Sequence, residues 1–233
     1  MGNLFSMDNK FFSALSKFAD LAILNIVFLI TCIPIFTIGA ATTSLYEVTM
    51  KMVKDEESYV IRGYLKAFKS NFKQSTLMFL IVAVVIGILV TDIMIIDASS
   101  GTFWSILEIC VIAFLFVAIF IVSYVFPVQA KFVNNIKNTL KNATILSIRF
   151  LPKTVVIVIL NIIFPICMGW TAVTMLYGVL AYTLIGFSLV AFLNSFFFVK
   201  IFDKIIEEAN TLENPEETDV LGDSEEAEET IEE

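Results

Sequence analysis

A run of 46 residues, 154–199, contains no charged side chain. As one helix it would be about 69 Å long, at ~1.5 Å per residue. The hydrocarbon core of a bilayer is only about 30 Å thick, and one crossing needs ~20 apolar residues. The run is therefore long enough for two crossings that fold back on each other, which predicts an integral membrane protein.

The composition agrees with a membrane protein. Hydrophobic residues make up 58% of the chain and charged residues 16%, whereas soluble domains carry about 25% charged residues. The net charge of −8 is uneven, because residues 200–233 hold 2 basic and 14 acidic side chains against 13 and 9 in residues 1–199. We predict a transmembrane domain over residues 1–206 and a disordered, acidic cytoplasmic tail over residues 207–233.

The predicted fold is an all-α integral membrane protein whose apolar runs form about five transmembrane helices. These crossings are expected at residues 21–44, 75–96, 103–127, 154–173 and 175–199. A cleaved signal peptide is the alternative for the first run, because Gly39-Ala40-Ala41 is typical of a cleavage site. That run is too long, however, and acidic residues precede it, so we expect an uncleaved helix.

The distribution of basic residues predicts the orientation. The segment 47–74 holds six Lys and Arg residues, and the segment 128–153 holds five and no acid. With five crossings, both segments and the C-terminus lie on one side. Because basic segments stay cytoplasmic, this side is expected inside the cell and the N-terminus outside.

Both basic segments have helical periodicity, with an apolar stripe beside a basic one. Such juxtamembrane helices lie at an interface and bind either lipid headgroups or a partner protein. The candidate docking residues are Arg62, Lys66, Phe68, Lys69, Phe72, Lys73, Leu140 and Phe150.

Four polar residues within or near the crossings are further candidates. Asp92 and Glu108 lie near the outer ends of the second and third crossings, where they either couple a cation or proton or reach the headgroup layer. Asn161 and Asn194 lie inside crossings, as does Asn25, and we expect these amides to form hydrogen bonds between helices. Pro34 and Pro165 are expected to bend their helices.

A family resemblance rests on residues 36–46, Phe-Thr-Ile-Gly-Ala-Ala-Thr-Thr-Ser-Leu-Tyr, with Pro34 upstream. Glu57-x-Tyr59-Val60 and the Phe68…Phe72-Lys73-Gln74 helix follow. This order resembles the YesL-like family, integral membrane proteins of Gram-positive bacteria with no assigned function. The likeness extends over roughly residues 5–200 and excludes the acidic tail. It implies an association with carbohydrate uptake by ATP-binding-cassette (ABC) transporters, because genes of this family typically lie near genes for such systems.

The chain lacks a phosphate-binding loop, zinc signatures, a nucleophile elbow and any histidine. We therefore expect neither an enzyme nor a cofactor, and no nucleic-acid partner. The favoured function is a non-catalytic accessory or regulatory partner of a carbohydrate ABC transporter in the plasma membrane, bound to its permease or ATPase subunits. The alternative is a small secondary transporter or channel that uses the bent helices with Asp92 and Glu108. A third reading is that the basic helices only anchor their segments to anionic lipid.

Overall fold

The structure is a computed structural model that describes residues 2–56, 59–98, 101–168 and 171–213. These residues form helices throughout and no strand, so the all-α class is confirmed. In chain order the elements are α1 (Gly2–Cys32), η1 (Ile35–Thr37), α2 (Ile38–Val53), α3 (Val60–Asp97), α4 (Thr102–Lys131), α5 (Ile136–Arg149), α6 (Leu151–Met168), α7 (Ala172–Ala181), the π-helical η2 (Tyr182–Gly186) and α8 (Phe187–Glu213).

The predicted first crossing, residues 21–44, is not one helix. The chain leaves α1 after Cys32, makes the short turn η1, and re-enters a helix, α2, at Ile38. Pro34 has an extended backbone, with φ −75° and ψ 112°, and it lacks the N–H that a continuing helix would need. The Thr37 hydroxyl closes the turn by donating to the carbonyl oxygens of Thr31 and Pro34, each at 2.6 Å. Pro34 therefore ends the helix, and the predicted bend within one continuous crossing is wrong.

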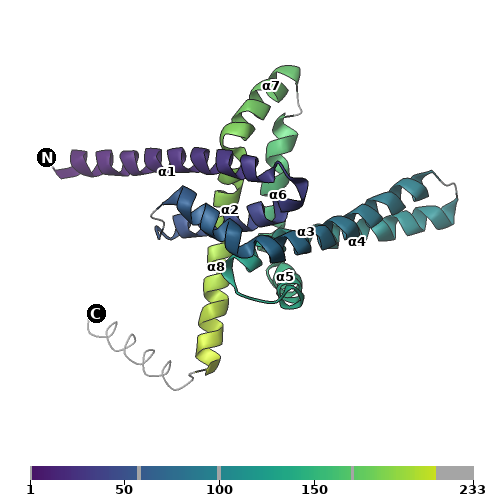
Figure 1. The fold of residues 1–233 in the computed structure, drawn as a ribbon. Helices are drawn as coiled ribbons and strands as arrows, with labels where there is room; N and C mark the ends of the chain where they lie inside the picture. Colours follow the sequence, from purple (N-terminus) through teal and green to yellow (C-terminus); the bar gives the residue numbers. More distant parts are fainter. Residues whose placement is uncertain (1, 57–58, 99–100, 169–170, 214–233) are drawn as a thin grey trace, which may run out of the picture.

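Helix α2 lies at the centre of the molecule and packs against α1, α3, α4 and α8 (Figure 1). Its small residues permit this close approach. A Cβ added at Gly39 would lie 2.6 Å from Cβ of Phe79 and would also overlap the Ser75 carbonyl oxygen. We call α2 and the parts of the other helices that surround it the central body.

Helices α3 and α4 form a hairpin whose outer half leaves the central body as an arm (Figure 1). The predicted amphipathic helix before residue 75 and the predicted crossing 75–96 are both parts of the continuous α3. The predicted crossing 103–127 corresponds to α4 (Thr102–Lys131). We call the outer halves of these two helices the α3–α4 arm.

The last two predicted crossings form a second arm, which leaves the central body in another direction (Figure 1). The predicted crossing 154–173 is represented by α6, which ends at Met168, and residues 169–170 lie outside the described residues. The predicted crossing 175–199 is divided by η2 into α7 and α8. Helix α8 continues to Glu213, so residues 207–213 of the predicted disordered tail are helical, and residues 214–233 lie outside the described part.

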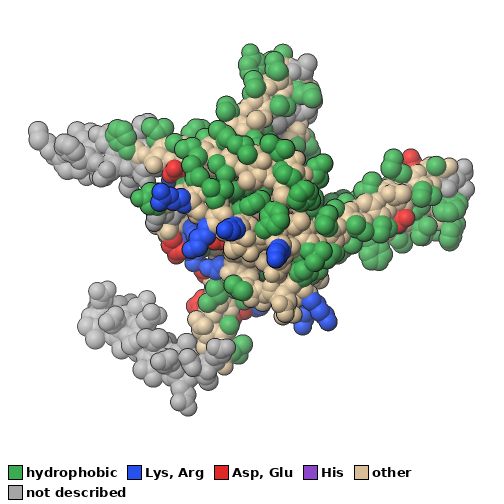
Figure 2. Space-filling view, in the orientation of Figure 1, with side chains coloured by type: hydrophobic (Ala, Val, Ile, Leu, Met, Phe, Trp, Pro, Cys, Tyr) green, Lys and Arg blue, Asp and Glu red, His purple; other side chains and the backbone are tan. Residues whose placement is uncertain are grey.

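Four stretches of the described chain are long and apolar enough to cross a membrane: Leu15–Cys32, Val60–Asp97, Thr102–Lys131 and Val173–Leu212. A fifth is added if α5 and α6, bent by 101°, count as one span. Hydrophobic side chains cover the surface of both arms, whereas Lys and Arg side chains gather over the central body (Figure 2). Apolar surface on this scale is stable only against lipid. The predicted class of integral membrane protein is confirmed.

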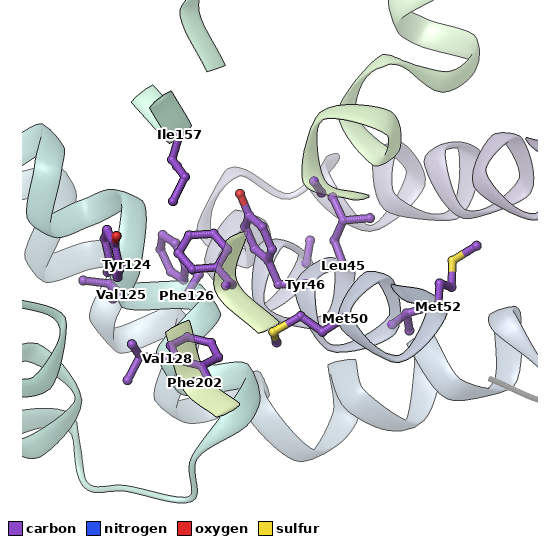
Figure 3. Close-up of a cluster of buried hydrophobic side chains, with 14 of the residues drawn as sticks. Leu45, Tyr46, Met50, Met52, Tyr124, Val125, Phe126, Val128, Ile157 and Phe202 are labelled. Carbon is purple, nitrogen blue, oxygen red and sulfur yellow. The ribbon is translucent and has the colours of Figure 1, made fainter. Parts of the chain in front are cut away.

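The core of the central body lies where α2, α4 and α8 meet (Figure 3). The ring of Phe198 packs edge-on against Tyr46 and Tyr124, with ring centroids 5.5 and 5.2 Å apart. Phe202 stacks on Phe198 one helical turn further along α8. These aromatic contacts join α2, α4 and α8 into one body, from which the two arms extend.

Candidate functional site

Asn25 joins α1 to the π-helical segment η2. This side chain is fully buried. Its amide nitrogen donates to the carbonyl oxygens of Thr183 at 2.6 Å and Tyr182 at 3.3 Å, and its oxygen accepts from the Ser188 N–H at 2.9 Å. A π-turn shifts backbone groups out of the usual α-helical pairing, and Asn25 supplies partners for them. The expected structural role of this buried amide agrees with the geometry.

The side-chain amides of Asn161 and Asn194 differ in their burial and in their hydrogen-bond partners. Asn194 is fully buried between α8 and α2, where its nitrogen donates to the Tyr46 hydroxyl at 3.4 Å. The neighbouring Ser195 hydroxyl bonds to Thr49 at 2.8 Å. Asn161, in contrast, is exposed on α6 and donates to the Ile157 carbonyl of its own helix at 2.8 Å. Asn194 therefore lies at a helix–helix contact, and Asn161 faces the surroundings of the protein.

Asp92 and Glu108 are half-buried on the α3–α4 arm, one on each helix near the turn. The ion pairs of the described residues involve neither carboxylate. From Lys73, the last basic residue of α3, to Asp92 the helix rises about 28 Å, at ~1.5 Å per residue. This length matches the hydrocarbon core, so Lys73 and Asp92 mark the two ends of an apolar segment of bilayer thickness.

The N-terminal part of α3 presents a basic face, defined by Arg62, Lys66, Lys69 and Lys73. All four side chains are exposed. Arg62 lies over the Tyr59 ring at 5.3 Å, and no ion pair within the described residues involves any of the four. The opposite side of the same helix is buried in the central body through Tyr64, Ala67, Ser75 and Met78.

The predicted apolar anchors of a partner serve mainly to pack this chain. Phe68, Leu140 and Phe150 are half-buried against the hydrophobic core, and Phe72 packs edge-on against Phe68 at 5.5 Å between centroids. The apolar side chains that remain exposed beside the basic residues are Ile61 and Leu65 on α3 and Ile145 and Ile148 on α5. An amphipathic stripe has the same sequence pattern whether it faces lipid, a partner or its own core, which is why the sequence did not separate these residues.

A network of hydrogen-bonded polar side chains lies at the base of the α3–α4 arm, and the sequence did not predict it. The Gln129 amide oxygen on α4 accepts from Gln74 of α3 at 2.9 Å and from the Thr139 hydroxyl of α5 at 3.1 Å. Its nitrogen donates to Asn71 at 3.4 Å, and Asn71 donates to Glu47 of α2 at 3.3 Å. Side-chain bonds thus join four helices where the arm leaves the central body.

Three ion pairs bring the basic segments and the two ends of the described chain together. Lys17 of α1 lies 2.5 Å from Asp55, which follows α2. Lys54 lies 2.7 Å from Asp203 of α8. Arg149 of α5 binds both carboxylate oxygens of Glu208 on α8, at 2.8 and 3.0 Å.

The contact between Lys17 and Asp55 conflicts with the predicted orientation, which places these two residues on opposite sides of the bilayer. The sequence held a signal for the alternative. All 15 Lys and Arg residues lie in four segments, 10–17, 51–73, 131–153 and 200–204. The three intervals between these segments each match a helical hairpin, α1–α2, α3–α4 and α6 to α8. The first interval, 18–50, is too long for a single straight crossing, and the chain divides it at Pro34 into α1 and α2.

Part of the chain is similar to a described protein family. Residues 21–93 match the family described as "Protein of unknown function, DUF624". The resemblance to the YesL-like family is consistent with this match. The matched region contains the α1–α2 turn, α2 and the basic face of α3. No curated protein and no solved structure matches the chain.

Proposed function

We propose that this protein is a non-catalytic accessory or regulatory partner of a carbohydrate ABC transporter in the plasma membrane. Two observations support the proposal: the family match covers the basic face of α3, and the family resemblance implies an association with carbohydrate uptake. The partner is a permease or ATPase subunit of the transporter, and this chain itself lies in the lipid bilayer.

The main observation behind the proposal is that the central body holds α3 in place while the basic face of this helix stays exposed. One side of α3 is fixed in the central body, while Arg62, Lys66, Lys69 and Lys73 point outward without acidic partners in the described chain. From Arg62 to Lys73 the face extends about 16 Å, at ~1.5 Å per residue. Exposed Ile61 and Leu65 add apolar contact area beside the charges. A surface of this kind suits an acidic patch on the cytoplasmic side of a transporter.

The proposal includes a revised orientation, in which the N-terminus, both basic segments and α8 beyond residue 200 lie on the cytoplasmic side. It rests on the ion pairs within the central body and does not depend on the directions of the arms. Each hairpin then begins and ends on the same side, and the intervals 18–50, 74–130 and 154–199, which form the membrane parts of the hairpins, contain no Lys or Arg. This distribution satisfies the preference of basic residues for the cytoplasmic side more fully than the five-crossing orientation does.

Co-purification tests the partner. The tagged full chain is extracted from native membranes in mild detergent, and the proteins that accompany it are identified by mass spectrometry. We expect sugar-permease or ATPase subunits with the wild type, and about a fivefold lower yield with Lys66→Glu/Lys69→Glu, since each charge pair contributes modestly. The control is Lys137→Glu/Lys141→Glu on α5, which should retain the subunits. Absence of transporter subunits from the wild-type preparation would refute the proposal.

A second candidate function is a small secondary transporter or channel. The half-buried positions of Asp92 and Glu108 on facing helices of one arm favour it, because intramembrane carboxylates often mark ion pathways. Purified protein in liposomes should then carry a substrate or ion flux that Asp92→Asn and Glu108→Gln abolish. The accessory function predicts no flux from the protein alone.

A further inference from the structure

Helix α5 exposes a second basic surface next to the end of α8. Lys137 and Lys141 are exposed on α5 and belong to no ion pair of the described residues. At the C-terminal end of the same helix, Arg149 already binds the Glu208 carboxylate of α8 through two bonds. Acidic residues of the C-terminal region therefore pair with α5 at the point where the described chain is about to end.

A groove lies between the two helices beside this ion pair. It is lined by Phe132, Asn142, Ile145, Leu146, Arg149 and Ile205 and has a volume of about 230 Å³. Ile145 is 48% exposed within it. The groove thus offers apolar walls of a size suited to one or two aliphatic side chains, with positive charges along α5.

The C-terminal segment has the complementary chemistry. Residues 214–233 contain no basic residue, and an apolar pair, Val220-Leu221, lies between its acidic residues. The acidic residues are Glu216, Glu217, Asp219, Asp223, Glu225, Glu226, Glu228, Glu229, Glu232 and Glu233. We propose that this segment folds back along α8 and covers α5, with Val220-Leu221 in the groove and the acidic residues against Lys137 and Lys141.

The chain is long enough for this path. From Glu213 back to the level of Ile205 the distance along α8 is about 12 Å. The residues from 213 to 221 span up to about 26 Å when extended, at ~3.3 Å each. Because the segment is covalently attached, its effective concentration at the groove is on the order of millimolar, so weak charge pairs suffice to hold it. The docked segment shields the basic residues of α5 from other anionic partners and leaves the basic face of α3 open.

Proteolysis of the full-length protein tests the contact. The protein is placed in nanodiscs that contain phosphatidylglycerol, and a Glu-specific protease cleaves the C-terminal segment while intact mass is followed with time. Lys137→Gln/Lys141→Gln is expected to raise the cleavage rate about fivefold, since two surface ion pairs are lost. Leu221→Ser should raise the rate as well. The matched controls, Lys66→Gln/Lys69→Gln on α3 and Ile231→Ser in the segment, should leave the rate at the wild-type value.

Three results would overturn the proposal. Equal cleavage rates for the wild type and the α5 variant would show that the segment does not contact α5. Protection in detergent that disappears in phosphatidylglycerol nanodiscs would assign α5 to anionic lipid headgroups. Protection that increases with protein concentration would place the segment on a second copy of the chain.

Discussion

At the scale of single residues, the buried polar side chains hold the helices together. Asn25, Thr43 and Thr49 each bond across a helix–helix contact, to η2, to Ser75 and to Ser195. Each buried donor or acceptor without such a partner would cost about 1–3 kcal/mol. The sequence predicted the role of Asn25 but not its partners, because a π-helical segment has no distinct sequence pattern.

Replacement of Asn25 by alanine should destabilise the protein by about 1–3 kcal/mol, because two backbone carbonyls and one N–H lose their partner. Unfolding in SDS, followed by circular dichroism, measures this change. The matched control is Asn161→Ala on α6, whose amide bonds only within its own exposed helix, and it should be close to neutral. Equal effects of the two substitutions would show that the contact between α1 and η2 contributes nothing specific.

At the scale of helices, the predictions succeeded where the signal is local. The length of an apolar run determines whether a helix can cross a bilayer, so α3 and α4 were located to within a few residues at their outer ends. The turn at Pro34 depends on tertiary contacts, because Pro either bends or ends a helix according to what the next residues pack against. Here residues 39–52 pack on α3, and the free energy gained from this packing favours a separate α2.

The sequence predicted the exposure of some candidate docking residues but not the burial of others. The exposure of Arg62, Lys66, Lys69 and Lys73 could be predicted, since charged side chains are rarely buried without a partner. The positions of Phe68 and Phe150 could not, because the central body that covers them is assembled from α2, α4 and α8. The spacing of apolar residues indicates that one face of a helix is apolar, but it does not indicate whether lipid, a partner or the chain's own core covers that face.

The contact of α2 with α3 gives a prediction at this scale. Gly39→Ala should destabilise the protein by about 1–3 kcal/mol, because the added Cβ overlaps the Ser75 carbonyl and Phe79. Gly87→Ala on the α3–α4 arm is the control, since its Cβ would meet no atom within 4 Å. It should be neutral or slightly stabilising, by up to about 1 kcal/mol, because alanine favours a helix. Thermal unfolding of both variants in the same detergent decides between these outcomes.

At the scale of the whole molecule, the three hairpins return to the central body, over which Lys and Arg side chains gather (Figure 2). The ion pairs of Lys17, Lys54 and Arg149 join the N-terminal helix, both basic segments and α8 there. In the proposed orientation, the basic face of α3, the groove beside α5 and the N-terminus lie on one side of the membrane. The two orientations agree on the side of both basic segments and the C-terminus, and they differ in the side of the N-terminus.

Side-specific labelling of single cysteines tests the shared side most directly. Cys32, Cys110 and Cys167 are replaced by alanine, and a cysteine is introduced at Ser13, Ser70 or Thr102. An impermeant maleimide is then applied to intact cells and to opened membranes. We predict that Thr102→Cys reacts in intact cells, whereas Ser13→Cys and Ser70→Cys react only after the membrane is opened. Reaction of Ser13→Cys in intact cells, with Ser70→Cys protected, would contradict the account and restore the five-crossing orientation.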